Sequence, residues 1–552
     1  MKKSKKLAAA ALTMALALSN VTASFACTGL YVGSQVSQTG STYIGRSEDI
    51  SEQHGKLFDV APAKDWPAGA IYEDAYGFSM PYPSHTYAYT YVRDSYTYGE
   101  CVQDENGNDI GQPYAAAGTN EKGLSVTATV STKYNEMAEA ADPLVDTGIC
   151  EISMTSILLG GAATAKEGVE LLANIIDTYG AGECNALILS DTNEVWYFEV
   201  VSGHQYAAMK LPDDKAALNP NIMLLGEIDP EDTENVVVSK DLVKVAREGG
   251  FYQTGENGKF HVAKSYGPAQ PKDRSASRYY QGLYYLNPEQ AAQLEQGNVE
   301  LSLMVDPSKK LSTMEALQFL GYRGEGSAMN SNEDPDIYPI GNNRQAECHV
   351  FELRKGLPAQ LASIEWLSMG DADFSVFVPF YGALLTATNE HYHQEGDAYV
   401  ENSINWNFQT INAICAEDRD HCGAKVKEYF AQYQQSIVDQ QAEVDTQMQK
   451  IFAQDPELAK EKATALADNL AQQVYEMSTS VLAELQSYVE AGNFEEVFVP
   501  TAMTDGLMPQ YNFDQVGGTG LKEGFNWTVA AVAGVVVVVA AAGGYVLYKK
   551  KK

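Results

Sequence analysis

From residue 27 to about residue 380, the spacing of hydrophobic residues alternates between the period of a strand and that of a helix. Runs of β-branched and aromatic residues at period two predict strands, and apolar residues three or four positions apart predict helices. Predicted strands cover 28–34, 41–48, 123–132, 185–202 and 349–356, the first two as a hairpin, and predicted helices cover 153–180 and 239–250. Strands followed by helices and further strands indicate an α+β domain built in layers.

Between residues 405 and 495 the composition changes to one rich in Ala, Gln, Glu and Lys. Val444, Met448 and Ile451 follow one another at helical spacing, which predicts an antiparallel helical hairpin or bundle. Core contacts explain these positions better than a partner-binding coiled coil does, because the heptads are not sustained. We therefore expect a helical appendage at 405–495, attached to a domain at 27–400.

Both ends of the chain carry features of export and membrane attachment. Residues 1–26 combine a lysine-rich start, an apolar run and small residues before the end, the three parts of a cleaved signal peptide. Residues 527–548 carry no charge and are long enough to cross a bilayer as a helix, and the lysines at 549–552 are expected to stay cytoplasmic. With a glycine-rich flexible stalk at 496–526, the sequence predicts an exported, single-pass membrane protein whose body lies outside the cell.

The formal net charge of −35 over 552 residues narrows the range of partners. Lysines cluster at the two ends, so the body between them is strongly acidic. Such a body repels phosphate backbones, which argues against nucleic acid as a partner. A homo-oligomer is left open.

Seven cysteines occur without a Cys-x-x-Cys pair, so a structural zinc site is not indicated. Disulfides are allowed outside the cytosol, and Cys415 and Cys422 are close enough in sequence to form one. Setting Cys27 aside leaves an even number of cysteines. An odd thiol in an exported protein is a candidate for a reactive group.

Two polar clusters are interpreted as loops rather than as metal sites. The string NEHYH at 389–393 contains a glutamate and two histidines but has no second group of ligands, which favours an exposed loop. The string DENGNDIG at 104–111 lacks the glycine and the glutamate of a calcium loop, which favours a turn. No metal or organic cofactor is predicted.

Removal of residues 1–26 makes Cys27 the first residue of the mature protein, with a thiol and a free α-amino group on one residue. An α-amino group has a pKa of about 8, so near neutral pH it can take the thiol proton directly or through a water. Signal cleavage is then an activation step. The alternatives are a lipid-attachment site, which Ser24 and Phe25 match poorly, and a structural thiol awaiting a disulfide.

The motifs that follow Cys27 resemble a known family. Their order is RSED with Arg46 and Asp49, GTNEKGL at 118–124, EVWYFE at 194–199, LNPN with Asn219, and SASR with Arg278. Over roughly residues 27–385 the chain resembles the secreted cysteine dipeptidases of the N-terminal-nucleophile superfamily, which are related to choloylglycine hydrolase and penicillin V acylase. The resemblance implies an αββα sandwich, in which two stacked sheets lie between helices.

The resemblance also implies a role for each motif residue. Cys27 would be the nucleophile and its α-amino group the general base; Arg46 would stabilise the thiolate, Asp49 would orient the amine, Asn219 would position the amine or donate to the oxyanion, and Arg278 would organise the network. Bile-salt and penicillin hydrolases carry an oxyanion asparagine where this sequence has Val130. Thr129 or Ser131 is an alternative donor, together with a backbone N–H.

The sequence thus predicts a cysteine dipeptidase that cleaves dipeptides and short peptides through a thioester, outside the cell. Two alternatives are a bile-salt or N-acyl amide hydrolase with the same machinery, and a non-catalytic, surface-anchored binding protein.

Overall fold

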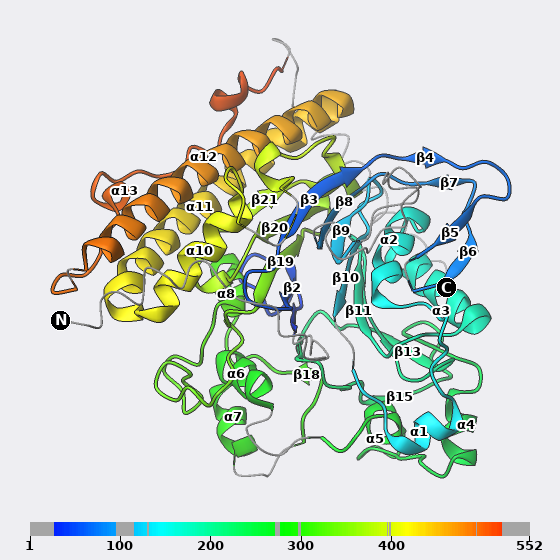
Figure 1. Cartoon of the computed structure of the whole chain (residues 1–552). Helices are drawn as coiled ribbons and strands as arrows, with labels where there is room; N and C mark the ends of the chain where they lie inside the picture. Colours follow the sequence, from blue (N-terminus) through cyan, green and yellow to red (C-terminus); the bar gives the residue numbers. More distant parts are fainter. Residues whose placement is uncertain are drawn as a thin grey trace, which may run out of the picture.

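The computed structural model describes residues 27–74, 76–94, 115–129, 132–270, 276–295, 300–394, 396, 399–492 and 494–521. Two large antiparallel sheets dominate it (Figure 1). The seven-stranded sheet has the order β18 (Met304–Val305), β14 (Ala216–Asn219), β1 (Thr28–Val32), β2 (Thr42–Asp49), β19 (Gln345–Leu353), β20 (Ser363–Ser368) and β21 (Val378–Phe380). The eight-stranded sheet has the order β16 (Val236–Val238), β13 (Tyr206–Lys210), β12 (Val195–Val200), β11 (Ala186–Ser190), β10 (Ser125–Thr129), β9 (Ala117–Thr119), β8 (Tyr89–Asp94) and β3 (Lys56–Ala61).

Three short strand pairs and several helices complete the described part of the chain. The pairs are β4 (Lys64–Asp65) with β7 (His85–Thr86), β5 (Ile71–Glu73) with β6 (Ser79–Pro81), and β15 (Glu227–Ile228) with β17 (Phe260–His261). The shorter helices include α1 (Glu136–Ala141), α4 (Leu242–Glu248), α5 (Val262–Tyr266), α6 (Ser277–Leu286), α7 (Pro288–Glu295) and α9 (Ala359–Ala362).

Helices cover the outer face of each sheet. Helices α2 (Glu151–Gly161) and α3 (Ala165–Tyr179) pack on the eight-stranded sheet, and the predicted helical run at 153–180 is thus confirmed as two helices. The amphipathic α3 begins at the Thr164 cap, whose side chain accepts from the Glu167 N–H, and ends at Gly180, where φ is +76°. The result is the αββα arrangement expected from the resemblance.

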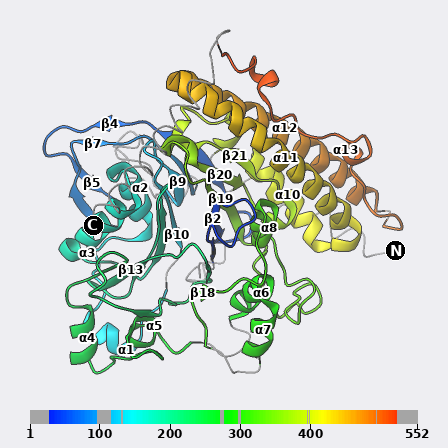
Figure 2. The same cartoon turned by 180° about the vertical axis from the view of Figure 1, so that it is seen from behind.

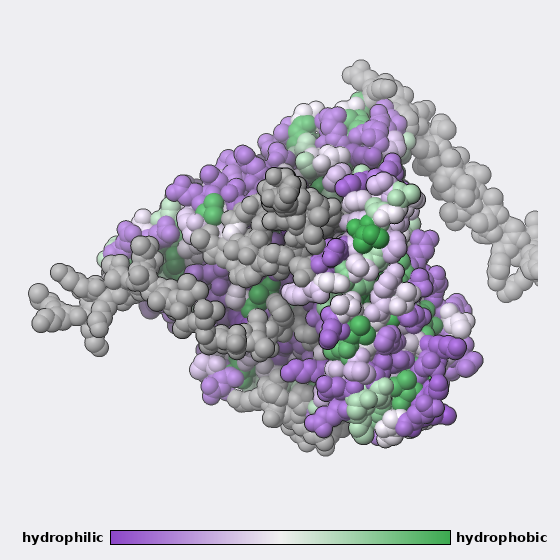
Figure 3. Space-filling view, turned by 45° about the vertical axis from the view of Figure 1, so that its right-hand side comes forward, coloured by the Kyte–Doolittle hydropathy of each residue, from purple (hydrophilic) through white to green (hydrophobic). Residues whose placement is uncertain are grey.

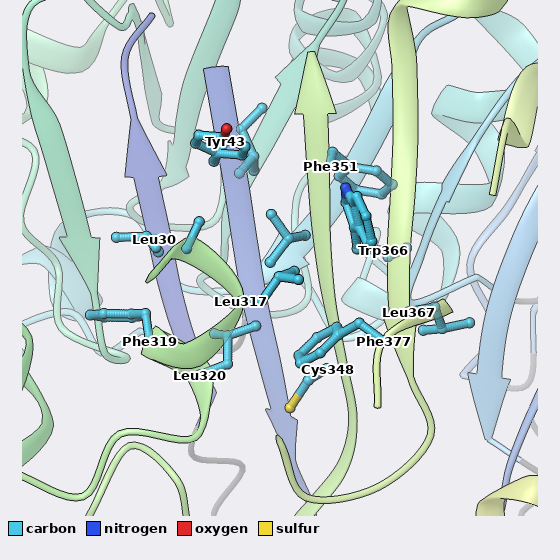
Figure 4. Packing of buried hydrophobic residues seen from close by; sticks show 14 of the residues in the cluster. Leu30, Tyr43, Leu317, Phe319, Leu320, Cys348, Phe351, Trp366, Leu367 and Phe377 are labelled. Atoms are coloured by element: carbon cyan, nitrogen blue, oxygen red, sulfur yellow. The ribbon is translucent and has the colours of Figure 1, made fainter. Parts of the chain in front are cut away.

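The outer layer of the seven-stranded sheet is made of α8 (Thr313–Leu320), α10 (Ile404–Glu417), α11 (Ala424–Gln454) and α12 (Pro456–Ala491). Figures 1 and 2 show the three long helices side by side across one flank of the molecule. In the close view of Figure 4, the α8 side chains Leu317, Phe319 and Leu320 point at the sheet near Leu30 and Cys348. These side chains are all buried.

The segment expected as an appendage shares this hydrophobic core. Tyr429, Phe430 and Val444 of α11 belong to the same buried cluster as Leu30 of β1 and Trp366 of β20. The helices at 404–491 therefore form one wall of the sandwich. Apolar residues at helical spacing predicted that one face of these helices is buried. They did not predict which surface that face contacts, because the surface is formed by strands that are distant in the sequence.

Residues 496–521, expected within a flexible stalk, lie against the long helices instead. The segment contains two short helices, α13 (Thr501–Thr504) and η7 (Phe513–Val516). Phe498, Tyr511 and Phe513 are buried in the core cluster. Apolar burial thus outweighs the flexibility that the glycines indicated.

The predicted signal peptide at 1–26 and membrane helix at 527–548 lie outside the described residues. In the part of the chain that the structure covers, no helix is both long and apolar enough to cross a bilayer. The face drawn in Figure 3 is mostly hydrophilic, with hydrophobic residues scattered over it.

Two expectations about side chains are corrected. Cys415 and Cys422 are both buried free thiols, and the Cys415 thiol contacts the Cys422 carbonyl oxygen at 3.7 Å. The string at 389–393 contains the short helix η5 (Glu390–Tyr392), and His391 is buried there and stacks on Tyr475 rather than lying in an exposed loop. The string at 104–111 and Cys101 fall outside the described residues.

Candidate active site

Strand pairing gathers the predicted residues at one end of the seven-stranded sheet. Gly29 of β1 is paired with Arg46 of β2 on one side and with Asn219 of β14 on the other, and Arg46 is paired in turn with His349 of β19. Because side chains alternate along a strand, residues in one such row lie on the same face. Cys27, two positions before Gly29, lies next to this row, and its side chain is only 1% exposed.

Arg46 is the group in contact with the predicted nucleophile. Its Nη2 lies 3.5 Å from Cys27 Sγ, and its Nη1 donates to the Ala116 carbonyl at 3.3 Å. Burial raises the pKa of the Cys27 thiol to about 12, although the charge of Arg46 acts in the opposite direction. The thiol therefore needs a base to become the attacking thiolate.

Three carboxylates surround this guanidinium. Arg46 Nη2 lies 3.3 Å from Glu48 Oε1 and 3.4 Å from Glu151 Oε1, and Nη1 lies 3.9 Å from Glu347 Oε1. Burial opposes the charge on Arg46, but the thiol and these carboxylates hold the pKa of Arg46 well above its usual value. Arg46 is thus a permanent cation beside the sulfur.

Two of these three carboxylates, Glu48 and Glu347, also contact a second side chain. Glu48 is paired with the buried Lys56. Glu347 Oε2 lies 3.0 Å from His349 Nδ1, and His349 Nε2 lies 3.0 Å from Thr127 Oγ1 on the other sheet. A row of polar groups therefore connects the two sheets beside Cys27.

Asp49 lies at the end of β2 in a different environment. Its Oδ2 accepts a 2.7 Å hydrogen bond from Asn342 Nδ2. Burial raises the pKa of Asp49 to about 6, against the effects of Arg278 and of this hydrogen bond. A new cation close to Asp49 would lower that pKa again.

Arg278, at the first turn of α6, joins β1 to the loop after β14. Its Nη1 donates to the Cys27 carbonyl oxygen and, at 2.9 Å, to Thr28 Oγ1. Its Nη2 donates to the Pro220 carbonyl at 2.9 Å and to Asn221 Oδ1 at 2.8 Å. The residue predicted to organise the network thus holds the main chain of Cys27 in place.

Asn219 ends β14 and contacts the second sheet. Its Nδ2 donates a 2.8 Å hydrogen bond to the Tyr197 hydroxyl, which donates in turn to Glu199 Oε1 at 2.7 Å. Glu199 also accepts the Leu224 backbone N–H at 2.9 Å. Val130, which stands where the bile-salt and penicillin hydrolases carry the asparagine, and Ser131, one of the two alternative oxyanion donors, lie outside the described ranges. The other alternative, Thr129, is the last residue of β10.

The structure thus brings together Cys27, Arg46, Asp49, Asn219 and Arg278. Sequence reasoning missed the partners Glu48, Glu151, Glu347, His349 and Tyr197. Glu48 had a signal, because it shares a strand face with Arg46 two positions away. Glu151 belongs to a helix and Tyr197 to the other sheet, so no spacing in the sequence relates them to Cys27.

Within the described ranges, no group of three or more His, Cys, Asp or Glu side chains is placed to hold a metal ion. The chemistry available at the site is that of a buried thiol beside a guanidinium, with amide and hydroxyl donors around it. Such a site suits acyl transfer, in which a thiolate attacks a carbonyl carbon and donors stabilise the oxyanion.

Two stacked sheets between helices, with Cys27 directly before the central strand β1, form the αββα arrangement that the resemblance implied. The sequence profile of Peptidase family C69 matches residues 26–432. The chain belongs to this family and is a peptidase.

The similar proteins agree with this assignment. "Probable dipeptidase B" of Streptococcus pyogenes serotype M1 is 34% identical over 498 residues, which cover 87% of this chain and 97% of that protein. "Probable dipeptidase" of Latilactobacillus sakei is 29% identical over 484 residues, which cover 83% of this chain and 94% of that protein. Penicillin V acylase from Agrobacterium tumefaciens is similar in structure over 64% of this chain and 85% of its own, at 14% identity and a TM-score of 0.25, which is too weak a likeness to support an inference.

Proposed function

We propose that this chain hydrolyses dipeptides and short peptides with Cys27 as the nucleophile. The observation that carries the proposal is the 3.5 Å contact between Arg46 Nη2 and Cys27 Sγ at the buried start of β1. The relatives named as probable dipeptidases match nearly their whole length. They support peptides as the substrate class.

The proposed reaction begins when residues 1–26 are removed. The α-amino group of Cys27 is then free and takes the thiol proton, and the thiolate attacks the scissile carbonyl carbon. The proton passes to the departing amine as the C–N bond breaks, which leaves a thioester. Water, deprotonated by the same amino group, attacks the thioester and releases the acid and the thiol.

The protein residues divide this work between them. Arg46 stabilises the thiolate, and Asp49 holds the amino group once it carries a proton. Asn219, oriented by Tyr197, donates to the oxyanion. Arg278 keeps the Cys27 main chain aligned through its carbonyl oxygen.

We further propose that the peptidase acts outside the cell. The signal-like residues 1–26 support export, and the uncharged run at 527–548, followed by lysines, supports a membrane anchor with a cytoplasmic end. Fractionation of cells, with protease added to intact cells, tests this arrangement. Full protection of the body from external protease would contradict it.

One preparation tests the catalytic proposal. The mature protein is analysed by mass spectrometry and assayed against a panel of dipeptides and against glycodeoxycholate. We expect an unmodified Cys27 at the N-terminus and hydrolysis of dipeptides. A lipid on Cys27, or activity on the bile-acid conjugate alone, would overturn the proposal.

A chain with one extra residue before Cys27 tests the role of the amine. The extension turns the α-amino group into an amide, so turnover should fall by about 10²- to 10⁴-fold, the usual contribution of a general base. Unchanged turnover in the extended form would show that the amine is not the base. An extension of the same length at the C-terminus serves as the control.

A further inference from the structure

Glu151, the first residue of α2, differs from the other carboxylates that contact Arg46. Its side chain is 17% exposed, against 4% for Glu48 and 0% for Glu347. Within the described part of the chain, Arg46 is the only cation at ion-pair distance from Glu151, whereas Glu48 also has Lys56 and Glu347 also has His349. Glu151 is thus the most accessible of the three and the least neutralised.

The position of Glu151 relates it to the reacting sulfur. The same atom, Arg46 Nη2, lies 3.5 Å from Cys27 Sγ and 3.4 Å from Glu151 Oε1. The carboxylate and the sulfur are therefore neighbours across one guanidinium nitrogen. A group bound to Glu151 would lie within a few atoms of the carbon that Cys27 attacks.

The surroundings of the α2 N-terminus argue against binding of the substrate's carboxylate group at this position. A helix N-terminus attracts anions, so it is a natural place for the carboxylate end of a peptide. Here Glu183 already accepts the Glu151 backbone N–H, and Asn185 Nδ2 holds Glu183 with a 2.9 Å hydrogen bond. With that position filled by a protein carboxylate, the surroundings of Glu151 favour a cation.

We infer that Glu151 binds the α-ammonium group of the substrate and so restricts cleavage to the first peptide bond. This inference rests on the function proposed above. In a dipeptide one carbon separates the ammonium nitrogen from the scissile carbonyl carbon. An ammonium held at Glu151 therefore leaves that carbonyl next to Cys27, and a longer N-terminal side would not fit between the two groups.

The protonation of Glu151 is consistent with this role. Burial raises the pKa of Glu151 to about 8, with Glu183 and Glu48 adding to the effect and Arg46 opposing it. A bound ammonium would supply the missing counter-charge and lower that pKa. Glu151 acts as a specificity-determining residue that contacts the substrate.

The test compares Ala-Ala with N-acetyl-Ala-Ala, which lacks the ammonium. For the wild-type enzyme we expect kcat/KM to be about 10- to 100-fold higher for Ala-Ala, the range of a charge-assisted hydrogen bond. In Glu151→Gln this ratio should fall to about one, through a higher KM for Ala-Ala. Glu151→Asp should recover part of the ratio. Glu170→Gln, which removes a carboxylate at an exposed position of α3 away from Arg46, should keep it.

The outcomes separate the inference from the proposed function. Equal loss of kcat/KM for both substrates in Glu151→Gln would overturn the inference and leave the dipeptidase function standing. If the wild-type enzyme cleaves both substrates equally well, the inference is overturned and the dipeptidase function stands. This measurement needs no variant, so it decides the matter even if Glu151→Gln does not fold. Wild-type enzyme that cleaves neither substrate would overturn the proposed function, and the inference with it.

Discussion

The Asn219 side chain donates a 2.8 Å hydrogen bond to the Tyr197 hydroxyl, and this bond joins β14 of one sheet to β12 of the other. Tyr197 is itself held by Glu199, which the Leu224 backbone N–H also contacts. The orientation of the Asn219 amide is thus determined by the second sheet. The proposed oxyanion donor depends on how the two sheets are aligned.

Replacement of this donor should lower turnover more than replacement of its support. In Asn219→Ala, kcat should fall by about 10²- to 10³-fold, the cost of removing one oxyanion donor. Tyr197→Phe leaves the amide present but less well oriented, so its effect should be smaller and lie in kcat rather than KM. Steady-state kinetics on one dipeptide measure both. A larger loss in Tyr197→Phe than in Asn219→Ala would contradict this order.

Loss of the sulfur should affect chemistry and leave the fold intact. Cys27→Ser should keep the melting temperature but lose most of the turnover, because a hydroxyl is far harder to ionise than a thiol. Thermal unfolding and peptide hydrolysis are measured on the same sample. Cys184→Ser, at a buried cysteine outside the site, is the control. Wild-type rates in Cys27→Ser would refute a thiolate nucleophile.

Arg278 should not be replaceable by lysine. Its two terminal nitrogens serve four acceptors on β1 and on the loop at 220–221, and a single ammonium cannot hold both sides in the same geometry. Arg278→Lys should lower the free energy of unfolding by about 1.5–3 kcal/mol, the range for a hydrogen bond to a charged group, and reduce kcat. Denaturant unfolding measures the first effect. Arg247→Lys, on an exposed part of α4, should change neither quantity.

The buried carboxyl of Glu365 on β20 should make stability depend on pH. Burial raises its pKa to about 8, against the hydrogen bond from Thr90. Between the unfolded value and about 8 the folded chain keeps a proton that the unfolded chain loses. The stabilisation is therefore complete below the unfolded value, declines as the pH rises, and is gone above about 8.

A Gln substitution isolates this contribution. The free energy of unfolding should fall by up to about 1.4 kcal/mol per pH unit for this group in the wild-type chain. Glu365→Gln cannot ionise, so the slope between pH 5 and 8 should become shallower. Urea unfolding at a series of pH values measures the slope. An identical slope in both proteins would show that Glu365 is not protonated in the fold.

Local patterns in the sequence were sufficient for six strands of the two large sheets and for several of the helices. Period-two runs located β1, β2, β10, β11, β12 and β19, and the predicted hairpin of β1 and β2 is confirmed. Helical spacing likewise located α3 and α4. These signals are local, because each depends only on which face of one element is buried.

The surroundings of the site could not be predicted in the same way. Cys27 and the four motif residues that follow it in the sequence are brought together by the structure. Glu151 and Tyr197 join them only through the packing of α2 and of the second sheet, which no spacing encodes. The packing of 496–521 was missed for the same reason, because its apolar residues are far apart and lie among glycines.

The hold on Cys27 has a practical consequence. Arg278 and the pairing of β1 with β2 hold residues 27 and 28 in position. These contacts do not involve the Cys27 sulfur. A Cys27→Ala chain should therefore keep the surroundings of residue 27 in place and retain an uncleaved peptide long enough for crystallography. A structure of this inactive variant with a bound peptide would then show which substrate the enzyme accepts.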